Sequence, residues 1–243
     1  MTRVLILGSG PDVTACRAWP RAPFDAIVAI NNAWQVRPDW DHAIFPEDFP
    51  DTRKPPPCPR PRVQAAEFVP AQNAFGGVIY TGGTMAFTAG YWALHALRPR
   101  LIAYFGCDMT YAPSGQTHFY GTGTPDPLRD DPTLQSLEGK SARLMIHAAR
   151  QGCAVVNLSD GPSRLICPRA RPDTLPDRPA PHDADLAALA DAREAALGYM
   201  VASGRYWEAP GACDPAELRK VDALWLAAVG PLKRAAFTAE DDR

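Results

Sequence analysis

Glycines and polar residues interrupt the first apolar run of the chain, in the segment Gly8-Ser9-Gly10-Pro11-Asp12. The run before them, Val4 to Leu7, is continuous, as expected for a strand that is covered on both faces of a parallel sheet. Because glycine lacks a Cβ, it allows an anion to come close to backbone N–H groups. The segment predicts either a phosphate site or a tight strand-to-helix turn without a ligand.

The surrounding residues do not match the common nucleotide motifs. The dinucleotide fingerprint requires a glycine where Val13 stands and an acidic residue after the second strand, but that strand ends in Asn31 and Asn32. The chain also lacks a complete P-loop motif, because Leu134 stands where the first glycine would have to precede Gly139-Lys140-Ser141. Two asparagines can bind a base, a ribose or a phosphate, or they can hydrogen-bond the local backbone of a turn. NAD is therefore disfavoured as the ligand.

Three further segments carry groups suited to chemistry. Thr81-Gly82-Gly83-Thr84 precedes a helical segment, and a helix N-terminus suits a phosphate or carboxylate, although a buried helix capped by Thr81 would have the same sequence. Asp108 follows an apolar run and can hold a hydroxyl or a magnesium-bound water, or cap the next turn. The third segment is Ser114 to Gly123, a loop with the composition of a mobile lid, which contains His118 and Tyr120.

The elements that position these groups alternate between strands and helices. Continuous apolar runs predict strands over 4–7, 26–30, 43–45, 78–80, 101–105 and 154–158. Helical patterns begin at Gly83 and cover 132–152, followed by two more helices with Asp183 and Asp214 as N-caps. This order predicts a Rossmann-like α/β domain, with a mostly parallel sheet and helices on both faces, over 1–167. A Pro-rich linker (168–182) and a helical C-terminal extension (183–243) follow.

Composition limits the classes of partner. The 243 residues carry a formal charge of −2 and no long run of like charges, which gives an extended nucleic-acid surface little support. No segment reaches the roughly 18 apolar residues of a membrane span. The six cysteines are scattered without a Cys-x-x-Cys pair, so we expect reduced thiols in a cytoplasmic protein. The last helix combines Leu224, Trp225 and Leu226 with Lys220, Lys233 and Arg234. Packing on the main domain is the preferred interpretation of that helix, with peripheral membrane contact as the alternative.

Taken in order, several segments resemble the bacterial sialyltransferases of glycosyltransferase family 42 and the related group with archaeal 6-hydroxymethylpterin diphosphokinase. They are VLILGSGPD, FDAIVAINNAW, TGGTMAFTAGYWAL, LIAYFGCDMTY, THFYGTG and AVVNLSDGPSRL, and they cover roughly residues 3–166. The resemblance implies a nucleotide-binding, Rossmann-type transferase. By this similarity the nucleotide-binding residues are Gly8, Ser9, Gly10, Pro11, Asp12, Asn31, Asn32, Thr81, Gly82, Gly83 and Thr84.

The resemblance also implies the catalytic residues, with one departure. The family has a histidine as general base in a His-aromatic-x-Gly-His pattern, and Thr122 stands at that position here. A threonine hydroxyl cannot act as a base near neutral pH. We therefore expect His118 to replace the base, with Tyr120 as an orienting group or acid, and Asp108 to match the family's Gly-x-Asp element.

The function expected from this combination is transfer of a sugar from a CMP-activated donor to an acceptor hydroxyl. One alternative is pyrophosphoryl transfer from ATP to a pterin-like alcohol, which would require Mg²⁺, with Asp108 as a ligand and Glu47 or Asp48 as further candidates. Another is a nucleotide-binding module without catalysis, consistent with Thr122. No metal or other cofactor is required by the first interpretation.

Overall fold

The computed structural model of the chain describes residues 2–124, 126–209 and 211–230, and these contain a parallel six-stranded sheet. The strands are β1 (Arg3–Leu7), β2 (Ala26–Ile30), β3 (His42–Ile44), β4 (Arg62–Val63), β5 (Leu101–Phe105) and β6 (Ala154–Asn157). Their spatial order is β4-β3-β2-β1-β5-β6. The direction in which successive strands are added therefore reverses between β1 and β5, which is where ligands bind in open sheets of this kind.

Side chains of the central strands pack on both faces of the sheet. Along β1, Val4 and Ile6 enter one core cluster, whereas Leu5 and Leu7 enter the other. All four side chains are fully buried. Burial on both faces explains why the strand is a continuous apolar run rather than an alternating one.

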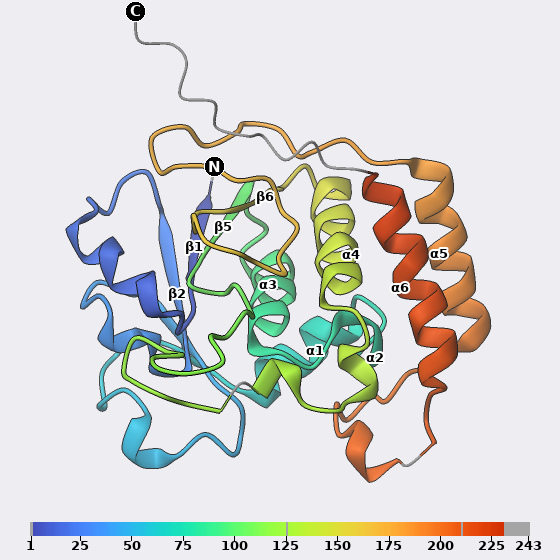
Figure 1. The fold of residues 1–243 in the computed structure, drawn as a ribbon, viewed down its shortest axis with the longest axis horizontal. Coiled ribbons are helices and arrows are strands. Elements are labelled where there is room, and N and C mark those ends of the chain that lie inside the picture. The colour runs from blue at the N-terminus through green and yellow to red at the C-terminus, as the bar shows by residue number, and fades with distance from the viewer. Residues whose placement is uncertain (1, 125, 210, 231–243) are drawn as a thin grey trace, which may run out of the picture.

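The two faces are covered by different elements. The α-helices are α1 (Ala65–Asn73), α2 (Val78–Thr81), α3 (Met85–Ala96), α4 (Leu137–Arg150), α5 (Ala184–Leu197) and α6 (Pro215–Val229). Figure 1 shows α3 and α4 beside the sheet, with α6 and α5 forming a further layer outside α4. The opposite face is covered by 3-10 helices, η1 (Pro11–Ala18) and η2 (Asn31–Gln35), and by irregular segments. The predicted α/β class with a parallel sheet is confirmed.

Some elements differ from those expected. Residues 78–80, expected to form a strand, belong to α2, because a short apolar run does not distinguish a buried strand from a buried helix. The helix expected over 132–152 begins later, at Leu137. The edge strand β4 was not expected, and it directly follows a Pro-rich stretch over 53–61. Proline cannot donate to the sheet, but the Pro61 carbonyl accepts from Ala43 N at 3.2 Å. Helix α1 was not predicted.

The C-terminal helices pack on the main domain, as preferred from the sequence. Asp183 and Asp214 accept hydrogen bonds from first-turn N–H groups of α5 and α6, so both predicted N-caps are confirmed. Trp225 of α6 is fully buried, which removes it from any membrane-facing surface, whereas Leu226 is partly exposed. Lys233 and Arg234 lie outside the described residues. Within those residues no helix is both long and apolar enough to span a bilayer.

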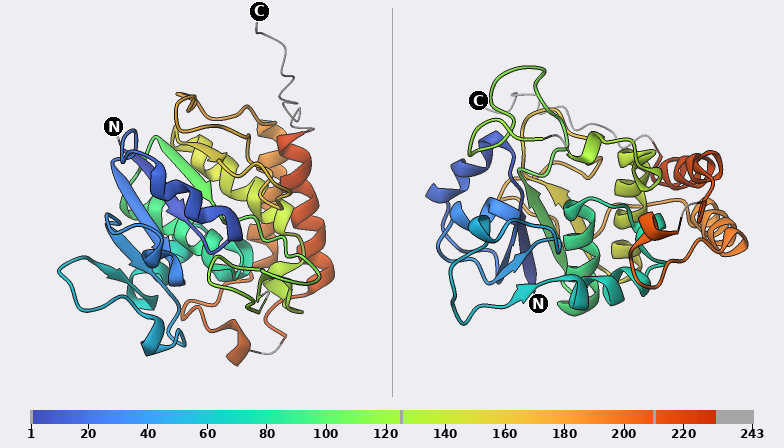
Figure 2. Two further views of the ribbon diagram at one scale, coloured as in Figure 1. Left: turned by 60° about the vertical axis from the view of Figure 1, so that its left-hand side comes forward. Right: turned by 90° about the horizontal axis from the view of Figure 1, so that it is seen from below.

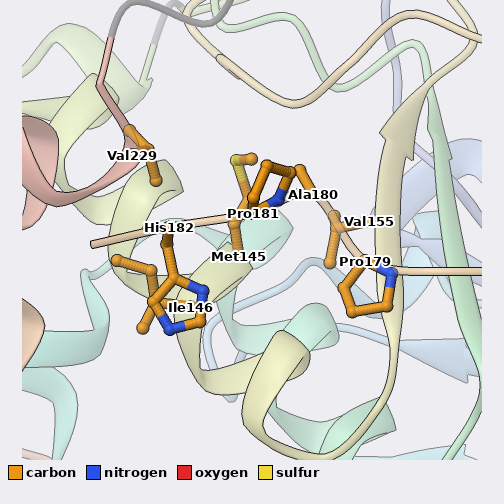
Figure 3. Close-up of a pocket in the computed structure, with 8 residues that line it drawn as sticks. All are labelled: Met145, Ile146, Val155, Pro179, Ala180, Pro181, His182 and Val229. Atoms are coloured by element: carbon orange, nitrogen blue, oxygen red, sulfur yellow. The ribbon is translucent and has the colours of Figure 1, made fainter. Parts of the chain in front are cut away.

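The Pro-rich linker lies against the domain. Its first residues extend the sheet edge, since Asn157 N donates to the Pro168 carbonyl at 2.9 Å. Its end passes over Met145 and Ile146 of α4, and Figure 3 shows Pro179 to His182 closing a cavity there. That cavity holds only about 10 Å³, at the lower limit for one water molecule. It therefore has no room for a substrate.

Candidate functional site

A cleft of about 440 Å³ lies at the carboxyl ends of β1, β2 and β5, where the strand order reverses. In Figure 1 the chain enters β1 from the top of the view, so these ends point down, toward the segments that follow β5. We call this space the first cleft. Its wall contains these residues expected from the sequence: Gly8, Ser9, Gly10, Pro11, Asp12, Asn31, Asn32, Thr84, Asp108, His118 and Tyr120.

The two positions after β1, residues 8 and 10, need glycine because the backbone there lies directly against the turn after β5. Gly8 N donates to the Phe105 carbonyl at 2.9 Å, and Gly10 N donates to the Gly106 carbonyl at 2.8 Å. A Cβ on Gly8 would lie 2.2 Å from the Gly106 oxygen, which is a severe overlap. These N–H groups are therefore used within the protein. Ser9 N and Asp12 N, which have no partner in the described part of the chain, are the donors left for an anion.

The backbone is strained where β2 and β5 open into the first cleft. Asn31 has φ of 51° and Met109 has φ of 53°, and a non-glycine residue rarely adopts such values. The Asn31 Oδ1 atom is buried and accepts no hydrogen bond from any described residue. Strained residues and unsatisfied polar atoms carry a free-energy cost and concentrate at functional sites. Asn32 is buried next to it, with 4% of its surface exposed.

Helix α3 presents its N-terminus to the first cleft, three residues later than the sequence interpretation placed the cap. Thr84 is the N-cap, and its hydroxyl accepts from Phe87 N at 3.3 Å. The N–H groups of Met85 and Ala86 line the cleft and make no hydrogen bond with the described residues. Free first-turn N–H groups and the helix dipole favour an anion there.

The rest of the Thr81–Thr84 segment lies elsewhere. Thr81 is fully buried, and its hydroxyl accepts from Gln72 Nε2 at 3.1 Å, so it is not the helix cap. Gly82 is the C-cap of α2 and does not line the first cleft among the described residues. Gly83 N donates to Thr133 Oγ1 at 3.1 Å, and this residue faces a neighbouring cleft. Only Thr84 of this segment reaches the first cleft. Thr81 ends the short helix α2 and Gly82 caps it, so the chain leaves α2 away from this cleft.

Asp108 lines the first cleft but is also bound to the sheet. Its carboxylate accepts from Asn157 Nδ2 at 2.9 Å and lies 3.9 Å from Arg169 Nη1. Its side chain is 18% exposed. The remaining acceptor capacity of the carboxylate suits a ligand hydroxyl, and the Asn157 amide fixes its orientation.

His118 lies at the cleft in an environment that keeps its imidazole neutral. Burial lowers the pKa of the ring below its usual value of 6.5. Its Nδ1 lies 2.9 Å from Thr117 Oγ1, which leaves Nε2 without a hydrogen-bond partner among the described residues. The ring stacks on Tyr120, with ring centroids 5.0 Å apart, and the centroid of the Tyr111 ring lies 5.7 Å from that of His118. A neutral imidazole with one free nitrogen can accept a proton.

The loop that carries His118 is attached to the glycine turn. Phe119 N donates to the Ser9 carbonyl at 3.0 Å, so the loop crosses directly over the start of η1. His118 and Gly121 exchange backbone hydrogen bonds, which close the loop tightly. The Thr122 hydroxyl donates to the Gly115 carbonyl at 2.9 Å, outside the first cleft. Thr122 therefore helps to shape this loop, while His118 occupies the cleft.

Arg53 is a candidate binding residue that sequence reasoning missed. It ends η3 (Asp51–Arg53), and its carbonyl accepts from Trp34 Nε1 at 2.8 Å, which fixes the backbone at the cleft rim. Its guanidinium makes no ion pair with the residues that the structure describes. Arg53 begins a basic, Pro-rich stretch with several arginines, and the sequence did not indicate which of them would line the first cleft.

The acidic residues considered for magnesium lie apart. Asp108 lines the first cleft, whereas Glu47 and Asp48 line the neighbouring cleft, and Glu47 pairs with Arg205 at 3.2 Å. The described residues contain no group of three or more His, Cys, Asp or Glu side chains arranged to hold a metal ion. The pairing of Asp108 with Glu47 or Asp48 around one ion therefore stays a prediction, with its residues in the walls of two different clefts.

The geometry thus joins one turn after β1, one after β2, one after β5 and the His118 loop around a single space. These segments lie far apart in the sequence and meet because the strands are parallel. No protein-family model, no curated protein and no solved structure matches this chain.

Proposed function

We propose that the protein is a nucleotide-dependent transferase that binds a CMP-activated sugar in the first cleft and transfers the sugar to an acceptor hydroxyl. The observation that carries this proposal is the convergence of unpartnered polar atoms at the reversal point of the sheet. They are the Asn31 amide oxygen, a neutral His118 and the free N–H groups of two helix starts.

The phosphate binds between the two helix starts. Ser9 N, in the turn after β1, and Asp12 N, at the start of η1, approach it from one side. Met85 N and Ala86 N approach it from the start of α3. The Arg53 guanidinium supplies a positive charge from the rim. Without such donors the negative charge of the donor's phosphodiester group would not leave water.

The nucleoside binds beside the phosphate, against β2. The Asn31 Oδ1 atom accepts a hydrogen bond from the exocyclic amine of the base or from a ribose hydroxyl. Binding would satisfy an oxygen that is otherwise buried without a partner, and it would offset the strain at this residue.

The transfer step uses His118 as general base. The acceptor oxygen attacks the anomeric carbon of the donor, and the bond from that carbon to the phosphate oxygen breaks. CMP leaves with the bonding electrons. The proton of the acceptor hydroxyl passes to His118 Nε2, the free nitrogen of a ring that burial keeps neutral.

Calorimetric titration with CMP, CTP, ATP and NAD, each with and without Mg²⁺, tests the proposal. We expect CMP to bind without magnesium and Asn31→Ala to weaken that binding about tenfold, the value of one good hydrogen bond. Gln151→Ala, an exposed amide at the end of α4, is the matched control and should leave CMP affinity unchanged.

The other outcomes identify the alternatives. Magnesium-dependent binding of ATP alone would replace this proposal with pyrophosphoryl transfer. Binding of CMP without release of CMP from any CMP-sugar would indicate a nucleotide-binding module. Failure of all four ligands to bind would show that the first cleft has no nucleotide function.

A further inference from the structure

A second and larger cleft, of about 1200 Å³, adjoins the first. Met85, at the start of α3, lies in the wall of both. The second cleft is bounded by α1, by the segment before α4 and by the segment that joins α5 to α6. Figure 2 shows this joining segment, drawn in orange-red, reaching back toward α1 and α2 when the molecule is seen from below.

The joining segment is held in place by specific contacts. The Tyr206 hydroxyl of η6 (Tyr206–Glu208) donates to the Asp131 carboxylate, and Arg205 pairs with Glu47 at 3.2 Å. Asp131 in turn pairs with Arg129 at 2.9 Å. The C-terminal extension thus contributes a fixed wall to a space at the ligand-binding edge of the sheet.

Gln72 places an unused hydrogen-bond acceptor in the wall of this cleft. The residue is 2% exposed, and its Nε2 donates to Thr81 Oγ1 at 3.1 Å and to Thr88 Oγ1 at 3.2 Å. Because Thr88 Oγ1 donates its own proton to the Thr84 carbonyl, it must accept from Gln72, which fixes the orientation of the amide. The Gln72 Oε1 atom accepts nothing from the described residues, although Gln72 lines the cleft.

Most of the charged groups that remain available to a ligand in the second cleft are hydrogen-bond acceptors. Arg205 is paired with Glu47, and Arg219 donates to Gln135 Oε1 at 2.6 Å. By contrast, the carboxylates of Asp48 and Asp130 line the cleft and have no ion pair within the described chain. The Gln72 oxygen and these two exposed carboxylates can therefore accept hydrogen bonds from the donors of a ligand.

Trp207 adds a flat apolar surface to the same wall. Its side chain is one of the most exposed large hydrophobic groups described, at 64%, and its ring packs edge-on against Tyr206. An exposed indole in a cleft offers a face for the C–H groups of a polyol or for an organic cation.

We propose that the second cleft binds a small molecule rich in hydrogen-bond donors, either hydroxyl or amino groups. Its polar groups bond to Gln72 Oε1, Asp48 and Asp130, and its apolar face lies on Trp207. Because Met85 is shared, a group of this ligand reaches the first cleft and is the acceptor of the transfer reaction. That last role rests on the proposed function, whereas binding itself does not.

The test is calorimetric titration of the whole protein with myo-inositol and maltose as polyol probes and with ethanolamine and spermidine as amine probes. We expect saturable binding of at least one class, weakened at least about tenfold by Trp207→Ala. Leu189→Ala, at another exposed apolar residue, on α5, is the control and should leave the affinity unchanged. Both substitutions are at exposed positions, so neither threatens folding.

The amine and the polyol classes are distinguished by charge. An amine ligand will bind more weakly in 0.5 M salt (a condition of roughly 4 Å screening length) and in the double variant Asp48→Asn, Asp130→Asn. The affinity for a polyol will not change with salt, but it will depend on the Gln72 acceptor. Gln72→Leu, which removes the acceptor, should weaken polyol binding more than Gln72→Glu, which keeps one.

Two results would overturn the proposal: no binding of any probe, or binding that Trp207→Ala leaves intact. A further comparison separates it from the proposed function. Probe binding that survives while CMP fails to bind would retain the second cleft as a ligand site and remove its role as acceptor site.

Discussion

At the scale of single residues, three polar atoms of the two adjoining clefts accept no hydrogen bond from the described residues. Asn31 Oδ1 and His118 Nε2 belong to the first cleft, and Gln72 Oε1 belongs to the second. Buried side-chain atoms without a hydrogen-bond partner in the described part of the chain also occur outside the clefts, at His42, Asn73, His147 and Asp222. Since an unpaired buried polar atom costs free energy, a ligand that donates to the buried Asn31 Oδ1 would stabilise the protein.

His118 provides a test at this scale. Burial holds the pKa of its ring below 6.5, so the imidazole is neutral at pH 7 and becomes cationic as the pH falls through that lowered pKa. The rate of CMP release from a CMP-sugar should therefore be constant near pH 7 and fall on the acidic side. His118→Gln should reduce kcat by about 10²- to 10⁴-fold, with little change in CMP affinity.

His95→Gln, on the exposed end of α3, serves as the control and should preserve both the rate and its acidic limb. Full activity of His118→Gln at pH 7 would exclude His118 as the base.

At the scale of elements, the site depends on two turns that come unusually close. The turn after β1 donates two backbone hydrogen bonds to the end of β5 and the turn after it, from Gly8 N to the Phe105 carbonyl and from Gly10 N to the Gly106 carbonyl. Gly106 has φ of 70°, a conformation that favours glycine. This contact sets the separation between Ser9 and Asp108 and therefore the width of the first cleft.

Gly8→Ala should destabilise the protein, because the new methyl group would overlap the Gly106 oxygen at 2.2 Å. We expect a loss of about 3 kcal/mol in the free energy of unfolding, the upper range for overpacking. Urea unfolding followed by circular dichroism measures it. Gly161→Ala is the matched control, since a Cβ there meets no described atom within 4 Å and the free energy should be nearly unchanged. Equal stability of the two variants would contradict this account of the turn.

At the scale of the whole molecule, a buried ion pair joins the C-terminal helices to the sheet domain. Arg143 of α4 lies 2.7 Å from the Glu194 carboxylate of α5, and both side chains are at least nine-tenths buried. Trp225 of α6 donates its indole N–H to the same carboxylate at 2.7 Å. The pair therefore fixes α5 and α6, and with them the segment that walls the second cleft.

Arg143→Leu should cost about 3–5 kcal/mol in unfolding free energy, because it leaves the Glu194 charge buried without a cation. The double variant Arg143→Leu, Glu194→Leu should recover much of that loss. The measurement is urea unfolding of all three variants as a double-mutant cycle.

The exposed pair Arg150–Asp191 provides the comparison, and Arg150→Leu should cost less than about 1 kcal/mol. If the double variant were no more stable than Arg143→Leu, the loss could not be assigned to an unpaired charge.

Much of the fold was predictable from local patterns. The runs at 4–7, 26–30 and 101–105 form β1, β2 and β5, since burial on both faces demands continuous apolar residues. Asp183 and Asp214 were recognisable as caps because capping depends on one side chain and the next turn. Residues 78–81 were not predictable, because an apolar segment of that length fits a buried helix as well as a strand.

The sequence by itself determined which residues follow the strand ends, and hence that Gly8, Asn31 and Asp108 meet at one edge of a parallel sheet. Only the tertiary structure decided that Arg53 and His118 reach that edge and that Thr84, rather than Thr81, is the N-cap of α3. It also decided that Gln72 lines a second cleft. The physical reason is the range of the interactions involved. Strands and caps follow from neighbouring residues, whereas loops and the joining segment near Trp207 are placed by packing between segments distant in the chain.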